Sequence, residues 1–421
     1  MKLITVIKKR FLFLVPIIAV LGPGIIAGNA DNDAGGITNY SIAGASFGYS
    51  LLWILLLTTF SLALTQEIGA RMGLVTGKGL GSLIREKFGI KWTVFIMVVL
   101  FVANTGTIAA NFAGIAASME IFNIQRLISV PVAAILIFLV VTKGNFKKLE
   151  RLFLLISFFY FAYILSAINI KPDWIAASKS LVMPNISLNS SYLLAMMAII
   201  GTTITPWGQF FIQAYVVDKK LTKDDLKIER GDVFLGSFLT NFIAFFIIVA
   251  TAGTLYAQGI HITDAKDAAL ALRPLAGEAA TIIFGLGFLN ASLFGAIIVP
   301  VTTAYVITGA FGLESGLNHK YSQAKEFYGL LAFSLILGAV LAALPFIPLL
   351  QILVATQAIN AVLLLPIFIF LYLLSNDKKI LGEYKNNRLI NILLIITFVG
   401  ISLAAILYTI SLFAPNLFNI F

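Results

Sequence analysis

Two aspartates, Asp31 and Asp33, interrupt an apolar stretch near the beginning of the sequence, in the run Asn29-Ala30-Asp31-Asn32-Asp33-Ala34-Gly35-Gly36. A carboxylate surrounded by apolar residues is unfavourable unless it is paired or functional. No Lys or Arg lies within the apolar part of a neighbouring segment, so a bound cation is the natural counter-charge. The alternative is a structural role, in which a basic residue neutralises the two carboxylates or they are protonated near Glu67.

A second interruption lies in the run Gly201-Thr202-Thr203-Ile204-Thr205-Pro206-Trp207-Gly208. Pro206 breaks the helical hydrogen-bond ladder because proline has no amide hydrogen. Carbonyls left free at the end of a half-helix favour a cation. We assign this role to the Thr202 carbonyl, and the Thr205 hydroxyl is expected to point into the same break. Alternatively, the proline only kinks the helix and the threonine bonds to its own backbone.

A third polar group lies in the run Thr356-Gln357-Ala358-Ile359-Asn360. Residues three apart lie on the same face of a helix, so Gln357 and Asn360 are expected to be neighbours. They are either ligands of the same cation or amides that bond across helices.

The elements that must position these groups are membrane-spanning helices. The chain has 421 residues, of which 60% are hydrophobic and 11% are charged, and a water-soluble domain cannot bury that much apolar surface. A spanning helix needs about 20 mostly apolar residues. Such runs predict eleven spans, near residues 11–46, 50–75, 92–122, 127–143, 150–169, 190–217, 231–257, 277–312, 326–345, 349–375 and 389–414.

Basic residues predict the orientation of these spans. Of the 29 Lys and Arg residues, 24 fall on the side of the N-terminus, and the others are Arg126, Lys171, Lys179, Lys266 and Arg273. Positive charge marks the cytoplasmic side. We therefore expect a bacterial-type inner membrane, a cytoplasmic N-terminus, an uncleaved first span and a C-terminus outside. The formal charge of +10 thus reflects orientation, and no nucleic-acid partner is predicted.

The two interruptions fall in the first and sixth spans, five spans apart. This spacing is typical of a five-plus-five inverted repeat, in which the substrate site lies near the midplane between two unwound segments. The predicted fold class is an all-α membrane protein with both of these helices broken. A single transmembrane domain over residues 1–421 would contain repeat halves at roughly 11–170 and 190–375, with an extra span at 389–414.

Missing residue types narrow the function. The sequence has no cysteine, and its two histidines, His261 and His319, fall in predicted loops. Thiolate sites and a histidine proton relay within the spans are therefore excluded, and no hydrolase-type nucleophile and base are placed together. We expect a transporter with no enzymatic activity and no cofactor. A channel fits less well, because two broken helices that meet at a carboxylate favour alternating access.

Several segments resemble the Nramp family of divalent metal transporters. Gly22-Pro23-Gly24, followed by Asp33-Ala34-Gly35-Gly36, is similar to the family's Gly-Pro-Gly and Asp-Pro-Gly-Asn pattern at similar spacing. Gly73-Leu74-Val75-Thr76-Gly77-Lys78 resembles the end of its second span, and Thr205-Pro206-Trp207-Gly208 falls where the family has Met-Pro-His-Asn. The resemblance implies a LeuT-like fold with the metal held by Asp33 and unwound backbone, close to the Ala30 carbonyl and Gly36.

Departures from the family pattern resemble the Nramp-related magnesium transporters. Gly36 replaces the family's asparagine, Thr205 its metal-binding methionine and Trp207 its histidine, while Asn111 and Gly114 stand where proton-coupled members carry acids. The Thr-Gln pair ending at 357 and the tail at 376–382 resemble the same branch. Loss of a soft thioether removes discrimination in favour of soft metals, and Mg²⁺ prefers one or two carboxylates with retained waters.

These observations predict a secondary transporter that imports divalent cations, Mg²⁺ in preference and Mn²⁺ as well, without proton coupling. Its partners are the metal ion and the lipid bilayer, and no oligomeric state is predicted. A proton-coupled Mn²⁺ or Fe²⁺ importer and an amino-acid transporter of the same fold class remain the alternatives. The expected metal site comprises Asp33, Thr202, Thr205, Gln357, Ala30 and Gly36, with Asp31, Asn32, Asn29 and Asn360 as neighbours.

Overall fold

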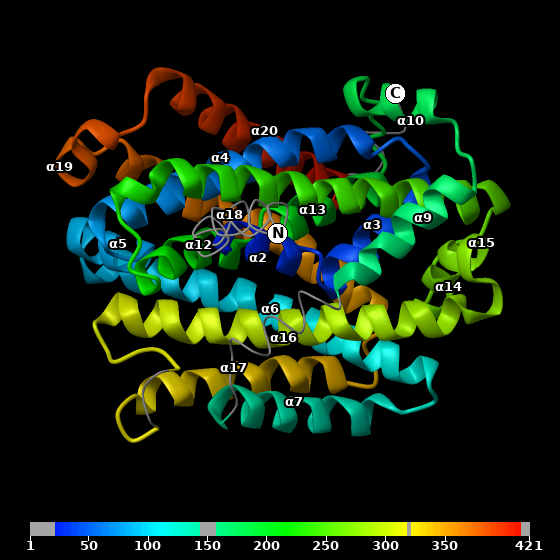
Figure 1. Ribbon diagram of the computed structural model, residues 1–421, viewed down its shortest axis with the longest axis horizontal. Coiled ribbons are helices and arrows are strands. Elements are labelled where there is room, and N and C mark those ends of the chain that lie inside the picture. Colours follow the sequence, from blue (N-terminus) through cyan, green and yellow to red (C-terminus); the bar gives the residue numbers. More distant parts are fainter. Residues whose placement is uncertain (1–21, 144–156, 318–320, 414–421) are drawn as a thin grey trace, which may run out of the picture.

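The computed structural model describes residues 22–143, 157–317 and 321–413, and the secondary structure in these ranges is helical (Figure 1). Most of the long helices run side by side along the longest axis of the molecule. They are α4 (Leu52–Thr76), α6 (Ile90–Ile121), α7 (Arg126–Lys143), α13 (Leu226–Thr254), α16 (Ala280–Phe311), α17 (Lys325–Ala343), α18 (Leu349–Ser375) and α20 (Arg388–Phe413).

Short helices mark the two ends of this bundle. One end carries α5 (Leu80–Phe88) and α19 (Lys378–Leu381), and the opposite end carries α10 (Trp174–Val182), α14 (Ala265–Ala269) and α15 (Arg273–Ala276) (Figure 1). We call them the α5 end and the α14 end. Segments that the sequence analysis treated as loops are thus partly helical.

Nine segments of the described chain are long and apolar enough to cross a membrane. Eleven spans were predicted. The two that are not counted are the first, predicted at 11–46, and the fifth, predicted at 150–169, and each extends into residues outside the described ranges. The described part of the fifth span begins with a 3-10 turn, Ser157–Tyr160, and continues as α9 (Phe161–Asn169).

Both predicted interruptions are confirmed. The first span consists of α2 (Pro23–Asp31) and α3 (Ala34–Phe47), and the sixth consists of α11 (Ser190–Thr203) and α12 (Pro206–Asp218). Each second half begins at a residue that caps the helix, because the Asp33 side chain accepts from Gly36 N and the Thr205 side chain accepts from Gly208 N. An N-cap followed by glycine at the third helical position is a local similarity between the two repeat halves that the sequence analysis did not find.

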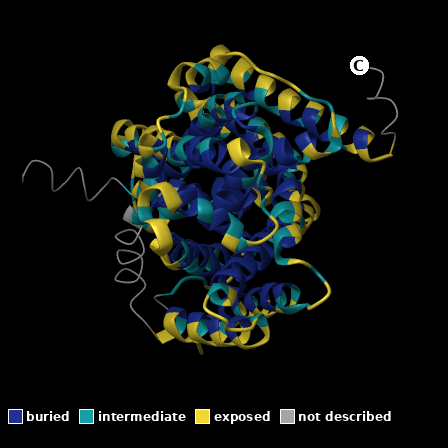
Figure 2. Ribbon diagram, turned by 90° about the vertical axis from the view of Figure 1, so that its right-hand side faces the viewer, coloured by how far each residue is buried: buried dark blue, intermediate teal, exposed yellow. Residues whose placement is uncertain are grey.

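The broken helices lie in the interior of the bundle. In the most apolar window of α11 and α12, 94% of the residues are buried, compared with 22% for α20. Figure 2 shows the same gradient from a buried centre to exposed outer helices. Only helices surrounded by protein can leave backbone groups unpaired within a membrane.

Glycines and a carboxylate attach α2 closely to α13. A methyl group added to Gly28 would lie 2.6 Å from the Gly236 carbonyl oxygen, which leaves no room for a side chain. The Asp232 carboxylate accepts hydrogen bonds from Gly22 N at 2.9 Å and Gly24 N at 2.5 Å and so caps the start of α2. The first half-helix is therefore held against α13 along most of its length.

Candidate functional site

Asp33 is the most firmly held carboxylate of the first break. Its Oδ1 accepts from Gly36 N at 3.1 Å, and its Oδ2 accepts from the Asn111 side chain on α6 at 2.7 Å. The side chain is 4% exposed. An ionised carboxylate has about four acceptor positions, so each oxygen retains room for one further partner. Both are fixed in direction, as a coordinating oxygen must be.

Asn111 also frees a backbone carbonyl. Its Oδ1 accepts from Ala34 N at 3.4 Å, so the amide that would continue the helical ladder to the Ala30 carbonyl is engaged elsewhere. Ala30 is buried, and its carbonyl lies at the end of α2. This supports the expectation that unwound backbone at Ala30 supplies an oxygen beside Asp33.

The second break leaves the Thr202 carbonyl without a helical donor. Helix α11 ends at Thr203, and the residue four positions after Thr202 is Pro206, which has no amide hydrogen. The Thr205 hydroxyl, by contrast, already has two partners. It accepts from Gly208 N at 3.2 Å and donates to Asp31 Oδ1 at 3.2 Å. Thr205 therefore orients Asp31 in this conformation, and its hydroxyl oxygen has one lone pair beyond the one that accepts from Gly208 N.

The two breaks meet at Gly36. A methyl group built on this glycine would lie 2.5 Å from the Asp31 carbonyl oxygen and 3.5 Å from the Thr202 hydroxyl. A larger residue here would have to push the two half-helices apart. Gly36 thus allows the backbone of the first and second breaks to approach closely beside Asp33.

Gln357 packs across both breaks from α18. Its side chain lies against Gly35, and its carbonyl lies against Gly201. The predicted pairing on one face is confirmed, because Asn360 Nδ2 donates to Gln357 Oε1 at 3.0 Å and to Thr107 Oγ1 at 2.8 Å. Gln357 Nε2 is buried without a partner. An amide N–H orients a water molecule better than it binds a cation, so Gln357 is suited to an outer, water-mediated role.

Asp31 and Asn32 lie beside the site. Asp31 Oδ2 and Asn32 Oδ1 are buried and accept no hydrogen bond. The Asn32 carbonyl accepts from the Tyr160 hydroxyl at 2.6 Å, which connects the break to the fifth span. The backbone of Asn29 belongs to α2, and its side chain lies outside the description of the structure.

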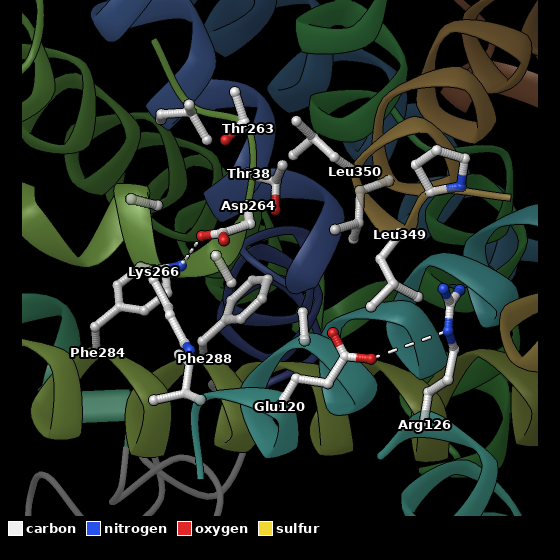
Figure 3. Close-up of a pocket in the computed structure, with 17 residues that line it drawn as sticks. Thr38, Glu120, Arg126, Thr263, Asp264, Lys266, Phe284, Phe288, Leu349 and Leu350 are labelled. Atoms are coloured by element: carbon white, nitrogen blue, oxygen red, sulfur yellow. Dashed lines mark hydrogen bonds and ion pairs between the residues drawn. The ribbon is translucent and has the colours of Figure 1, made fainter. Parts of the chain in front are cut away.

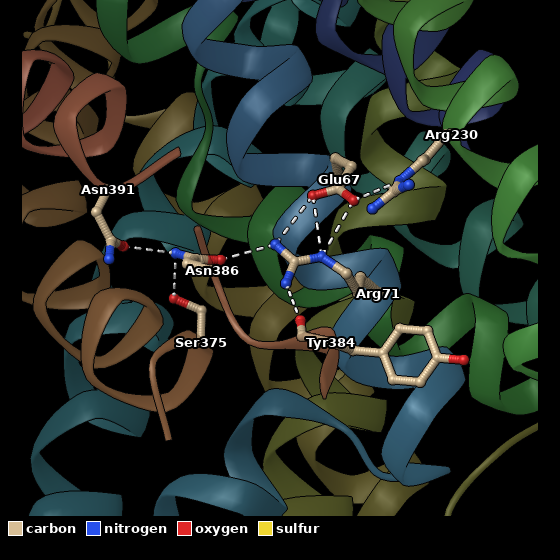
Figure 4. Close-up of polar contacts among 7 residues, drawn as sticks. All are labelled: Glu67, Arg71, Arg230, Ser375, Tyr384, Asn386 and Asn391. Carbon is tan, nitrogen blue, oxygen red and sulfur yellow. Dashed lines mark hydrogen bonds and ion pairs between the residues drawn. The ribbon is translucent and has the colours of Figure 1, made fainter. Parts of the chain in front are cut away.

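Glu67, the third carboxylate of the structural alternative, pairs with two arginines. It accepts from Arg71 Nε at 3.1 Å and from Arg230 Nε at 2.8 Å (Figure 4). Arg71 in turn donates to the Tyr384 carbonyl and, at 2.8 Å, to Asn386 Oδ1. Among the described residues, no Lys or Arg forms an ion pair with Asp31 or Asp33.

This network lies at the α5 end of the bundle. It joins α4 and α13 to the segment between α19 and α20, and Asn386 continues it to Ser375 and Asn391 (Figure 4). Arg71 falls within the span predicted at 50–75 and was counted among the basic residues on the N-terminal side. The structure places it inside α4, where it is 2% exposed.

A cavity of about 230 Å³ opens at the α14 end (Figure 3). Its lining reaches Thr38 on α3, five residues beyond Asp33, which corresponds to roughly 7.5 Å along a helix. Charged side chains of both signs line it, and Glu120 pairs with Arg126 at 3.9 Å. The remaining polar and charged lining residues include Thr263, Asp264 and Lys266.

The atoms around the breaks that could coordinate a metal ion are oxygens. Within the described ranges, no group of three or more His, Cys, Asp or Glu side chains is placed to hold a metal. What the breaks bring together is the Asp33 carboxylate, the Asp31 carboxylate and free carbonyls. Hard cations such as Mg²⁺ and Mn²⁺ favour such oxygens, and Mg²⁺ keeps several waters in addition.

Two further residues lie near the breaks and were not predicted as neighbours of the site. Gln66 on α4 and Gln209 on α12 are fully buried. Each is a polar residue inside an apolar run, and that signal was present in the sequence. Asn111 was noted only as a departure from the family pattern, and its contact with Asp33 spans 78 positions of the chain.

Comparisons with known proteins agree with this architecture. The family model described as natural resistance-associated macrophage protein-like, Nramp, matches residues 24–411. The divalent metal cation transporter MntH of Yersinia pestis (strain Pestoides F) is 26% identical over 407 residues, which cover 91% of this chain and 94% of that protein.

Two solved structures share the fold. The Eremococcus coleocola manganese transporter, in complex with an aromatic bis-isothiourea substituted compound, has a TM-score of 0.73 at 20% identity and covers 95% of this chain and 87% of its own. Mhp1, a nucleobase-cation-symport-1 family transporter, has a TM-score of 0.56 at 14% identity, with 93% and 90% covered. At these identities the likeness concerns the fold alone, and it confirms the predicted LeuT-like fold class.

Proposed function

The chain belongs to the Nramp family of membrane transporters, and from this premise we propose that it carries a divalent metal cation across the bilayer between its two broken helices. The observation that carries the proposal is Asp33, a buried carboxylate without a basic partner whose oxygens are fixed by Gly36 N and Asn111. A buried charge requires compensation. The transported cation supplies it, with the Ala30 and Thr202 carbonyls as further ligands.

The preferred ion in this proposal is Mg²⁺, with Mn²⁺ also accepted. Gly36 has no side chain and Thr205 has no thioether, so neither adds a soft ligand. Asp33 retains one free acceptor position on each oxygen, and Asp31 Oδ2 and Asn32 Oδ1 are buried acceptors without a donor. A partly hydrated ion fits this arrangement, since waters bound to a cation donate their hydrogens to such oxygens. Mg²⁺ is the cation that gives up its water least readily.

Transport without proton coupling is part of the proposal. The group beside Asp33 on α6 is the neutral amide of Asn111, which donates to the carboxylate and cannot accept its proton. Among the described residues the single histidine, His261, lies between the 3-10 turn Tyr256–Gln258 and α14, away from the breaks. Membrane potential and the ion gradient would then drive entry.

Alternating access is favoured over an open pore by the asymmetry of the two ends. The cavity approaches Asp33 from the α14 end, while the network of Glu67, Arg71 and Arg230 closes the α5 end. Because α5-end loops carry most of the basic residues, we assign this end to the cytoplasm, together with the N-terminus. The single transmembrane domain over 1–421, with its repeat halves and a C-terminus outside, belongs to the same proposal.

The test is ion uptake into proteoliposomes that contain a pH-sensitive dye. We expect saturable Mg²⁺ entry, competition by Mn²⁺, weak entry of Ca²⁺ and no acidification. Liposomes without protein and liposomes with the Asp33→Asn variant are the controls. Mn²⁺ entry with acidification and no response to Mg²⁺ would contradict the proposal and favour a proton-coupled importer.

An organic substrate is the competing candidate from the same fold class. Thermal unfolding in detergent separates the two, because a ligand that binds only the folded state raises its stability. We expect MgCl₂ to raise the unfolding midpoint and amino acids to leave it unchanged. The reverse result would assign Asp33 to an amine or to a coupling ion.

Thr205→Met tests the origin of ion selectivity. A thioether near Asp33 favours softer metals, so we expect the uptake ratio of Mn²⁺ to Mg²⁺ to rise about tenfold, which equals about 1.4 kcal/mol of differential binding. Thr205→Val is the matched control, since it removes the hydroxyl and its cap of α12 without adding sulfur. An unchanged ion ranking in Thr205→Met would show that this position does not set selectivity.

A further inference from the structure

Four buried acceptor oxygens between the first break and the α5 end have no donor. They are Asp31 Oδ2, Gln66 Oε1, Gln209 Oε1 and Gln213 Oε1. All four side chains are at most 1% exposed. Buried polar groups are almost always paired, so four unpaired acceptors in one region need an explanation. The proposed function uses none of the three glutamines.

The three glutamines lie along the contact between α12 and α4, which we call the seam. Thr205, Gln209 and Gln213 are spaced four apart and lie on one face of α12. Gln209 contacts α4 through Gly69, whose added methyl group would lie 3.5 Å from the Gln209 carbonyl. Gln213 packs its side chain against Gly73 on the same helix.

At the head of the seam, Gln66, Gln209 and Asp31 all lie beside the first turn of α12. A methyl group added to Gly208 would lie 2.8 Å from Thr205 Oγ1 and 3.8 Å from Gln66 Nε2. Thr205 donates to Asp31 Oδ1, and Gln209 Nε2 donates to the Thr205 carbonyl at 3.5 Å. The three side chains are therefore neighbours of Thr205.

The seam leads from the breaks to the α5 end. At its far end Gln213 Nε2 donates to the Lys78 carbonyl, at 2.8 Å, in the segment between α4 and α5. Figure 1 shows α12 running from the region of α2 toward the end that carries α5. Of the unpartnered polar atoms of these four residues, only Gln66 Nε2 is a donor. An acceptor-rich environment with one carboxylate suits a hard cation.

We infer that this seam contains a second cation station, formed by Asp31 with the amide oxygens of Gln66 and Gln209, through which a hydrated divalent ion passes on its way from Asp33 to the cytoplasm. The inference rests on the proposed function, because it gives the same ion its next position. In the present conformation the seam is packed, and the station is completed when α12 and α4 separate at the α5 end. Gln213 then receives the ion next.

The experiment counts Mn²⁺ ions bound to the full-length protein, by electron paramagnetic resonance. The parent protein is expected to bind one Mn²⁺ tightly, and Asp33→Asn none. A second carboxylate in the seam should make the station tight, so the variant that combines Asp33→Asn with Gln209→Glu is expected to bind one Mn²⁺ again. Asp33→Asn with Gln209→Leu should bind none.

A matched control carries the same change outside the seam. Asn290 on α16 is a buried amide with an unpartnered oxygen, and Asp33→Asn with Asn290→Glu is expected to bind no Mn²⁺. If Gln209→Glu does not fold, Gln66→Glu replaces it. A folded double variant that binds no Mn²⁺, while the parent still binds one, would overturn the station and leave the proposed function intact. A parent that binds none would instead overturn the proposed function.

Transport kinetics provide the second readout. Gln209→Leu should lower the maximal rate of Mg²⁺ uptake about tenfold, a typical effect of losing an oriented partner in a metal site, and leave KM unchanged because the Asp33 site is intact. A higher KM at an unchanged maximal rate would assign Gln209 to the Asp33 site and contradict a separate station.

Discussion

Replacement of Asp33 by asparagine is expected to abolish divalent cation uptake while the protein remains folded. Asparagine is as good a helix cap as aspartate, so the bond from Gly36 N that begins α3 is retained. The variant side chain has an NH₂ group in place of the second oxygen, so the Asn111 amide, which donates to Asp33 Oδ2 in the parent, must turn its own oxygen toward this group or lose the bond. The change thus removes the negative charge and one acceptor but keeps the cap. Loss of a partner of a metal ligand already lowers affinity or activity roughly 10–100-fold, and we expect loss of the ligand to exceed about 100-fold.

The matched control is Asp173→Asn. Asp173 caps α10 by accepting from Ala176 N at 2.9 Å, so it undergoes the same chemical change in the same structural role at an exposed position. Uptake of Mg²⁺ and Mn²⁺ by this variant should equal that of the parent, and both variants should unfold at the parental temperature. Uptake by Asp33→Asn within twofold of the parent would remove Asp33 from the metal site.

Local sequence signals predicted the broken helices and their central residues. Carboxylates inside an apolar run, and a Thr-Pro pair inside another, violate the rules for a continuous span. Such violations are expected at functional positions. Asp33 and Thr205 are both helix caps. Capping depends only on the residue itself and on the next few residues of the chain, so it can be predicted locally. Gln357 and Asn360 followed in the same way from the period of the helix.

Contacts between helices could not be predicted in this way. Most of the helices are apolar on nearly every side, so the sequence pattern does not reveal which face turns inward. The contact of Asn111 with Asp33 depends on the rotation of α6 about its axis. The position of Gln66 beside the second break depends in the same way on the rotation of α4. The same limit applies to Arg71, which was counted as a basic residue at the cytoplasmic end of its span and whose burial was not predicted. Its burial depends on Glu67 one turn earlier and on a backbone carbonyl at Tyr384.

The second large effect is expected for Glu67→Ala. Glu67 accepts from Arg71 through both of its oxygens, at 3.1–3.2 Å, and Arg71 is buried. Removal of the carboxylate leaves the guanidinium with the neutral acceptors Tyr384 and Asn386 only. Removal of one partner of a buried ion pair destabilises a protein by about 3–5 kcal/mol. Thermal unfolding in detergent should show a clear decrease of the midpoint.

Arg230→Ala provides the comparison. The Arg230 side chain is 46% exposed and also pairs with Glu67, and an exposed ion pair contributes less than about 1 kcal/mol. Its loss leaves the pair of Glu67 and Arg71 intact, so the unfolding midpoint should fall only slightly. Equal effects of Glu67→Ala and Arg230→Ala would show that burial of Arg71 does not decide the stability of this end.

Glu67→Ala also tests whether the network holds the α5 end closed. The sequence contains no cysteine, so a reporter at Gln213, which is fully buried, can be introduced without background. Gln213→Cys should react slowly with a water-soluble thiol reagent in the parent, and faster in Glu67→Ala, because α4 is then released from α13. Asn290→Cys, buried in α16, should stay slow in both. Faster reaction at both reporters would indicate general unfolding, whereas faster reaction at Gln213 alone would identify the network as the closure that alternating access must open.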